Sequence, residues 1–339
     1  MFAEIILLIG SLLLILAAAE GFTNGIEVFG KRFSFSQAVA GNLIAAIGTA
    51  LPETVLPLVA IFWSGTKNKS DIGVGAILGA PFMLSSLAFL ISGLTVLISC
   101  LMKRRKFEIR VEPHSVIRDM SFFIPMYTVG VFMPLLISKA LAIPISILLV
   151  GGYVVYAVMT AKSESGEITF VEGLRLWRLI KRLGFVKTDH PHTIFIAMQV
   201  AGSLCLMVLG ARGFVNNLGD LAVQWGMSPL LFALMLAPVA TELPEKFNSV
   251  MWLMKGKDAL AIGNISGAMV FQSAFPVTIG ILFTEWQITG LAIFSAIIAI
   301  LSASLLLVSL LVRKTISPFV LLAGGAFYAI YIMALLIWR

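Results

Sequence analysis

The chain has little charge. Aspartate, glutamate, lysine and arginine make up 12% of its 339 residues, whereas a soluble domain carries about 25%. Hydrophobic residues make up 59% of the chain, and the mean hydropathy is +1.02. Sparse charge between long apolar runs excludes an ordinary soluble domain and indicates an all-α membrane protein with several spans.

Cysteine and histidine are also scarce. Cys100 and Cys205 lie in apolar segments, which predicts buried free thiols rather than a disulfide. His114, His190 and His192 lie in polar loops without further ligands nearby. The chain therefore lacks the soft ligands of a transition-metal site, and we expect no bound cofactor.

The sequence does contain ten apolar segments of about the length that crosses a bilayer. Phe2 to Ala19 resembles a signal peptide, but it carries Glu4 and has no basic start, so we expect it to remain as the first helix. The predicted helices span approximately residues 2–20, 36–63, 72–100, 117–138, 140–160, 194–212, 228–254, 259–283, 288–311 and 316–337.

Most of the 24 lysine and arginine residues fall on one side of these segments. Because basic residues collect in cytoplasmic loops, both termini are expected outside the cytoplasm and the 161–193 loop inside it. We therefore expect an integral protein of a prokaryotic plasma membrane. The net charge of +7 belongs to the cytoplasmic face, so the expected partners are lipid and inorganic cations, with no nucleic acid and no obligate protein partner.

The 161–193 loop divides the chain into a first repeat, residues 1–160, and a second repeat, residues 194–339. Five helices in each half give the second half the opposite orientation in the membrane, as in many secondary transporters built from inverted repeats. Within the loop, Ile168 to Leu183 is amphipathic and predicts an interfacial helix, with either a regulatory role or a connecting one.

Similarity between the halves supports the repeat. Thr-x-Leu-Pro-Glu occurs at 49–53 and again at 241–245. A Gly-x-x-x-Gly pair follows each copy, at 75–79 and at 263–267. Such pairs of small residues let membrane helices approach closely.

The repeated motif groups oxygen atoms. In each copy the threonine and the glutamate share one helix face, and the proline frees the carbonyl four residues before it. The residues concerned are Thr49, Glu53 and Gly48 in the first copy and Thr241, Glu245 and Ala240 in the second. Two copies approach the six to eight oxygens that Ca²⁺ prefers and carry two negative charges. Alternatively, each glutamate is a hydrogen-bonded structural residue at a proline kink, which two symmetric copies disfavour.

Glu242 and Lys246 break the symmetry, because their counterparts in the first half are Ala50 and Thr54. They are four residues apart, in the favourable order for a helix ion pair. One interpretation is a neutralising pair, since either charge buried alone would be costly. A second interpretation is that the Lys246 ammonium occupies the position of a monovalent cation. A third is that Glu242 carries a proton during transport.

These motifs resemble the α-repeats of the Ca²⁺:cation antiporter superfamily, and specifically its Na⁺/Ca²⁺ exchanger branch. The signature there is Gly-Thr-Ser-Leu-Pro-Glu, followed on the next helix by Gly-Asn-x-x-Gly-Ser-Asn-x-Phe-Asn or Asp. The resemblance covers nearly the whole chain and implies ten helices with outside termini. The positions that match the family's Ca²⁺ ligands are Glu53, Glu245, Thr49 and Thr241, and those that match carbonyl contributors to a flanking Na⁺ site are Ala46 and Pro238.

The chain differs from the signature at several positions where the signature has an oxygen-bearing side chain. The departures are Ala50, Ala80, Leu84 and Ala268, together with Glu242 in place of a serine and Gln272 in place of the final Asn or Asp. The two glutamates of the signature are present in this chain, whereas several of the side-chain oxygens expected to hold Na⁺ are absent. The resemblance therefore leaves the coupling ion open between Na⁺ and H⁺.

We accordingly expect a secondary active antiporter and not an enzyme. Ca²⁺ would exchange for Na⁺ at a midplane site of two glutamates, while helices one and six, interrupted by glycines at 21–25 and 210–213, slide over the core. The alternatives are a proton-coupled antiporter of Ca²⁺ or another divalent cation, and a transport-inactive homologue. An intramembrane hydrolase would need an activated nucleophile or a metal cluster, which the motifs do not offer.

Overall fold

A computed structural model describes residues 2–32, 45–66, 68–137, 139–163, 173–182, 191–288 and 290–337. Within these ranges the chain is almost wholly helical, and the β pairing is limited to an isolated bridge between Ile109 and Ile316. The elements are α1 (Phe2–Arg32), α2 (Ala45–Trp63), α3 (Lys69–Met83), the π-helix η2 (Leu84–Ala88), α4 (Phe89–Leu101), α5 (Pro113–Leu136), the 3₁₀-helix η3 (Lys139–Leu141), α6 (Ala142–Ser163), α7 (Arg175–Arg182), α8 (Thr193–Gln224), α9 (Pro229–Met254), α10 (Asp258–Phe283), α11 (Gly290–Arg313) and α12 (Pro318–Ile337).

Eight helical segments are long and apolar enough to cross a membrane, judged by length and composition. α2 and α9 add shorter apolar stretches, Pro52–Trp63 and Pro229–Val239. Large apolar side chains such as Ile147, Leu148 and Leu209 are exposed on α6 and α8. Apolar surface of this extent suits lipid rather than water, so the prediction of an all-α membrane protein is confirmed at this level.

α1 and α8 are longer than predicted. α1 runs to Arg32 and α8 to Gln224, and both pass unbroken through the glycines at 21–25 and 210–213. The predicted interruptions are therefore wrong. Helical glycine loses only about 1 kcal/mol relative to alanine, which tertiary packing can offset.

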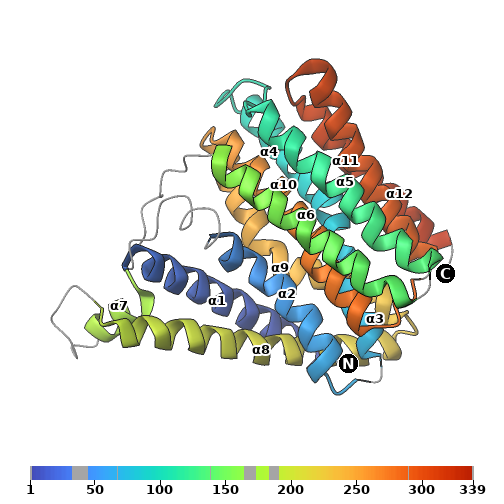
Figure 1. Ribbon diagram of the computed structural model, residues 1–339. Coiled ribbons are helices and arrows are strands. Elements are labelled where there is room, and N and C mark those ends of the chain that lie inside the picture. The colour runs from blue at the N-terminus through green and yellow to red at the C-terminus, as the bar shows by residue number, and fades with distance from the viewer. Residues whose placement is uncertain are drawn as a thin grey trace.

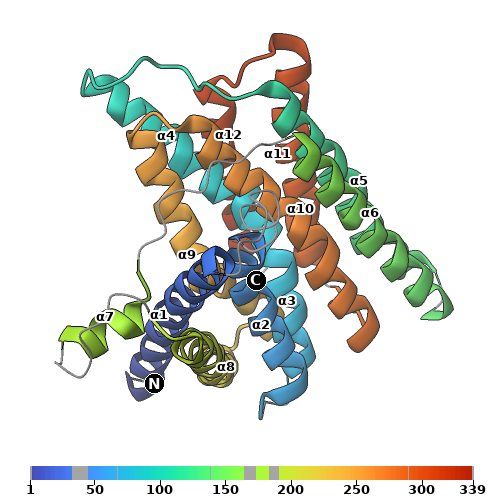
Figure 2. The ribbon, with the colours of Figure 1, turned by 60° about the vertical axis from the view of Figure 1, so that its left-hand side comes forward.

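These glycines mark the places where α1 and α8 touch. A Cβ atom built on Gly21 would lie 2.7 Å from Ser203 Oγ, and one on Gly210 would lie 3.0 Å from Ile15 Cγ1. Because the glycines have no side chain, the two helices lie side by side along their length (Figures 1 and 2).

The third predicted span is one helical segment from Lys69 to Leu101 with the π turn η2 in its middle. Pro81 has no N–H to donate within α3, which favours such a distortion. The hydroxyl of Ser85 donates to the carbonyl of Pro81 at 2.8 Å, and that of Ser302 on α11 donates to the carbonyl of Ser85 at 2.5 Å. Hydroxyl groups thus satisfy carbonyls around the π turn.

The last two helices of each half pack against helices of the other half. α5 and α6 lie against α10, while α11 lies against α3 and η2, and α12 lies against α4. The larger apolar core lies among these helices and includes Phe82, Phe123 and Tyr331. In Figure 1 the start of α1 and the end of α12 lie toward one end of the bundle, and the α4–α5 and α11–α12 connections lie at the other.

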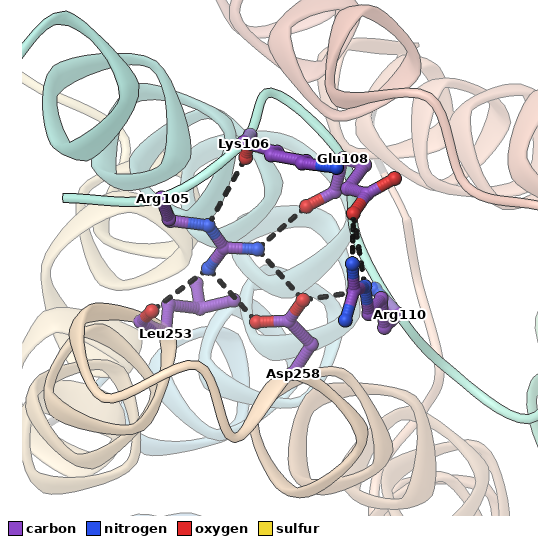
Figure 3. A network of polar contacts seen from close by, with 6 residues as sticks. All are labelled: Arg105, Lys106, Glu108, Arg110, Leu253 and Asp258. Carbon is purple, nitrogen blue, oxygen red and sulfur yellow. Dashed lines mark hydrogen bonds and ion pairs between the residues drawn. The ribbon is translucent and has the colours of Figure 1, made fainter. Parts of the chain in front are cut away.

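A polar network fastens the α4–α5 connection to the α9–α10 turn (Figure 3). Arg105 Nη1 and Nη2 donate to the two carboxylate oxygens of Asp258 at 2.8 and 2.7 Å. The same guanidinium donates to the carbonyl of Leu253 at 2.8 Å, near the end of α9. The backbone N–H of Arg110 also donates to Asp258 at 2.8 Å. Arg105 therefore caps one helix end while pairing with the first turn of the next.

The connecting loop contains the short helix α7, inside the predicted Ile168–Leu183 helix; residues 164–172 and 183–190 lie outside the described residues. Trp177 is buried, and the N–H of Arg175 donates to Asn24 of α1 at 3.0 Å. α7 thus packs on α1 and α8.

The prediction that both cysteines are buried is wrong. Both are free thiols, but Cys205 is exposed and Cys100 is partly exposed. An apolar segment that faces lipid can carry exposed residues, so hydropathy alone does not predict burial here.

Candidate ion-binding site

Glu53 is a buried carboxylate on the apolar helix α2. It follows Pro52 near the middle of α2, and its side chain is 4% exposed. Pro52 cannot donate to the carbonyl four residues earlier, so the helix carries a freed acceptor beside the carboxylate. A buried carboxylate requires hydrogen-bond donors or a cation.

Gln272 supplies such a donor from the other half of the chain. Its side-chain Nε2, on α10, donates to Glu53 Oε2 at 2.6 Å and to Glu242 Oε1 of α9 at 3.3 Å. The two hydrogens of one amide thus serve two carboxylates. This leaves Gln272 Oε1 buried and without a hydrogen-bond partner among the described residues. A buried, unpartnered oxygen in such a cluster is a candidate cation ligand.

Glu242 and Lys246 form the ion pair that their spacing predicts. Lys246 Nζ lies 2.8 Å from Glu242 Oε2, and the two side chains are 7% and 0% exposed. The pair is joined to Glu53 through Gln272. The described cluster therefore contains two carboxylates, one ammonium and one amide drawn from α2, α9 and α10.

The other predicted ligands lie along the same helices. Thr241 is 4% exposed, and its hydroxyl donates to the carbonyl of Ala237 at 3.4 Å. Pro238 is buried where α3 passes, with its Cγ 2.8 Å from a Cβ built on Gly79. Five further predicted ligands belong to α2 and α9, but beyond their place in these helices they lie outside the described part of the structure: Ala46, Gly48, Thr49, Ala240 and Glu245.

The close approach predicted for the first glycine pair is present. A Cβ on Gly75 would lie 2.2 Å from the carbonyl oxygen of Leu230, and one on Gly79 would lie 2.1 Å from that of Leu234. α3 and α9 are therefore in backbone contact beside the cluster. For Gly263 no described atom lies within 4 Å of such a Cβ, so the second pair has no equivalent contact among the described residues.

The ligand chemistry of the cluster is that of a hard cation. Carboxylate, amide and carbonyl oxygens suit Ca²⁺, Mg²⁺ or Na⁺, and not a soft transition metal. Among the described residues no three histidine, cysteine or acidic side chains converge. Glu53 and Gln272 alone offer fewer oxygens than the six to eight that Ca²⁺ prefers.

Asp119 on α5 is a buried acidic residue that the sequence reasoning passed over. It is 2% exposed, and it accepts hydrogen bonds from the hydroxyls of Tyr156 on α6, at 3.0 Å, and of Ser266 on α10. It borders a cavity of about 410 Å³ that Arg118 and Asn264 also line. A lone aspartate inside the apolar 117–138 segment was the signal that could have found it.

Comparisons with known proteins match almost the whole chain. A family model described as "Sodium/calcium exchanger protein" matches residues 3–162 and 195–338. The inner membrane protein YrbG of Escherichia coli (strain K12) is 24% identical over 351 residues, which covers 98% of this chain and 96% of YrbG.

Solved structures share the fold. The H⁺/Ca²⁺ exchanger CAX matches with a TM-score of 0.72 at 16% identity, over 98% of this chain and 82% of CAX. The sodium-calcium exchanger NCX_Mj matches with a TM-score of 0.57 at 19% identity, over 98% of this chain and 99% of NCX_Mj. At these identities the likeness concerns the fold alone.

Proposed function

Because the chain belongs to the sodium/calcium exchanger protein family, within the Ca²⁺:cation antiporter superfamily, we propose that it exchanges Ca²⁺ for Na⁺ by alternating access. The observation that carries the proposal is Glu53. This carboxylate is buried mid-helix and bonded to Gln272 of the other half. An ionisable residue at such a depth is functional by default.

The proposed architecture is two inverted repeats of five spans, α1–α6 and α8–α12, with α3, η2 and α4 counted as one span. The reciprocal packing supports it, because α5 and α6 lie on α10 as α11 and α12 lie on the α3–η2–α4 segment. In the proposed orientation the helix ends rich in lysine and arginine face the cytoplasm and both termini lie outside.

In the proposed site, Glu53 and Glu245 neutralise the divalent cation. Oxygens from the motif and its neighbours complete the coordination: Thr49, Thr241, Gly48, Ala240, Ala46 and Pro238. Gln272 Oε1 is a further ligand, and its lack of another partner supports that role. Binding neutralises a doubly charged pocket that would be costly to occlude when empty, so exchange is favoured over leak.

Proton coupling is the second candidate. Ala50, Ala80 and Leu84 offer no side-chain oxygen where the exchanger signature carries one, so fewer ligands are present for Na⁺. Carboxylates can take protons without additional oxygen ligands. In this version Glu53 and Glu245 exchange one Ca²⁺ for protons.

The deciding experiment measures Ca²⁺ uptake into everted vesicles or proteoliposomes under an imposed Na⁺ gradient and then under an imposed pH gradient. Uptake driven by the Na⁺ gradient supports the first candidate, and uptake driven by the pH gradient alone supports the second. Glu53→Gln should abolish uptake while the protein remains folded, and full uptake by this variant would refute the assignment. Absence of uptake by the unaltered protein under both gradients would indicate a transport-inactive homologue.

A further inference from the structure

The buried ion pair of α9 lies inside the candidate site. Glu242 is fully buried near the middle of the helix, and Lys246 is 7% exposed one turn later. Glu242 Oε2 faces the ammonium at 2.8 Å, while Glu242 Oε1 accepts from Gln272, which also holds Glu53. The ammonium is thus linked to Glu53 through two side chains.

The fold of the motif does not explain why this ion pair is present. The corresponding residues in the first half are the uncharged Ala50 and Thr54, so the helix motif forms without such a pair. Replacing a buried ion pair by apolar residues of similar volume is often neutral or even stabilising, because desolvation offsets the attraction between the charges. The pair therefore adds charge of both signs to the cation site without an evident gain in stability.

We propose that the Lys246 ammonium is a tethered cation of the exchange site. It occupies, in every state of the cycle, the monovalent-cation position that Glu242 creates. This inference rests on the proposed function. Glu242 then needs no mobile cation, and the mobile charge is set by Glu53 and Glu245 alone. One Ca²⁺ exchanges for two monovalent cations, and the exchange carries no net charge.

Voltage provides the first test. Purified protein in proteoliposomes, with the membrane potential clamped by K⁺ and valinomycin, should accumulate Ca²⁺ to a ratio independent of the potential. Lys246→Met removes the ammonium that neutralises Glu242. At alkaline pH, where Glu242 is ionised, the site of this variant should then bind a third monovalent cation in each transport cycle. For one net charge the Ca²⁺ accumulation ratio should then change about tenfold for each ~59 mV. Lys246→Arg keeps a cation and should stay independent of the potential.

Releasing the lysine provides the second test. Glu242→Gln removes the ion-pair partner of the ammonium within the candidate site. The unpaired ammonium then competes with Ca²⁺ for the remaining carboxylates, so half-maximal uptake should need at least tenfold more Ca²⁺. Combining Glu242→Gln with Lys246→Met removes the competitor and should restore the unaltered concentration dependence. This pair of variants also separates site charge from folding, because the double variant lacks the ion pair altogether.

Three results would overturn the proposal that Lys246 is a tethered cation. Voltage-dependent accumulation by the unaltered protein would overturn it, and this measurement needs no variant to fold. Voltage-independent exchange by folded Lys246→Met, or a double variant no better than Glu242→Gln, would equally overturn it and leave an ordinary ion pair. These results would leave the proposed antiport intact, whereas the absence of any Ca²⁺ flux in the unaltered protein would remove both.

Discussion

Gln272 of α10 donates a 2.6 Å hydrogen bond to Glu53 of α2, although 219 residues separate them in the chain. The bond joins the carboxylate of the first Thr-x-Leu-Pro-Glu copy to the helix that follows the second copy. The amide also reaches Glu242, so it holds two like charges near each other. Gln272 therefore links the two halves of the chain at the candidate site.

Replacing Gln272 tests this coupling. Gln272→Leu installs the residue type of its first-half counterpart, Leu84, and removes both hydrogen bonds and the unpartnered Oε1. We expect half-maximal Ca²⁺ uptake to need roughly 10–100-fold more Ca²⁺, as when a ligand loses its orienting partner. Ser273→Ala is the matched control, because its buried hydroxyl donates to the carbonyl of Val270, and it should change the value less than about twofold. An unchanged uptake curve for Gln272→Leu would contradict the role.

Much of the architecture was predictable from the sequence. Apolar length and turn residues predict the boundaries of α9 and α10 within one residue. The i,i+4 spacing of Glu242 and Lys246 predicts their ion pair, and Gly75 and Gly79 predict a close helix contact. These features depend on local geometry, which the order of residues determines.

The remaining features depend on contacts between distant segments. Nothing near Gln272 in the chain indicates that its amide bridges Glu53 and Glu242. The glycines at 21–25 read as helix interruptions, because the sequence does not show that α8 lies against them. The hydroxyl of Ser302, which reaches the π turn at Ser85, gives no local signal either.

The contact between α3 and α9 should not tolerate a side chain at Gly79. A Cβ there would lie 2.1 Å from the carbonyl oxygen of Leu234, so backbone must move. Gly79→Ala should lower the stability by about 1–3 kcal/mol, as overpacking does. The measurement is thermal unfolding in detergent. Gly202→Ala is the control, because a Cβ there meets no described atom within 4 Å, and it should leave the midpoint unchanged or raise it slightly.

The network in Figure 3 should contribute to stability through Arg105. Its guanidinium is 13% exposed and pairs with the buried carboxylate of Asp258 through two hydrogen bonds. Arg105→Met leaves that carboxylate with fewer donors, so we expect a loss of about 3 kcal/mol in the free energy of unfolding. Arg110→Met breaks a pair with Glu108 whose side chains are 75% and 47% exposed, and it should cost less than about 1 kcal/mol. Equal losses in the two variants would contradict this ranking.

Asp119 should act as a structural anchor between α5, α6 and α10. Its two oxygens accept hydrogen bonds from the hydroxyls of Tyr156 and Ser266. Asp119→Asn exchanges one acceptor for a donor, so one hydroxyl loses its partner in a buried place. We expect stability to fall by about 1–3 kcal/mol, measured by thermal unfolding in detergent. Asp220→Asn, on the exposed side of α8, should change it by less than about 0.5 kcal/mol.

A double-mutant cycle separates this hydrogen bond from a general effect of charge at Asp119. Ser266→Ala removes one of the two donors, so adding Asp119→Asn to it should cost less than Asp119→Asn costs alone, by about 0.5–3 kcal/mol. Strict additivity would mean that the carboxylate and the Ser266 hydroxyl do not interact, and that another neighbour of Asp119 is responsible for the loss. Because the Ser266 hydroxyl lies on the helix that carries Gln272, weakening the anchor should also shift the concentration of Ca²⁺ needed for half-maximal uptake.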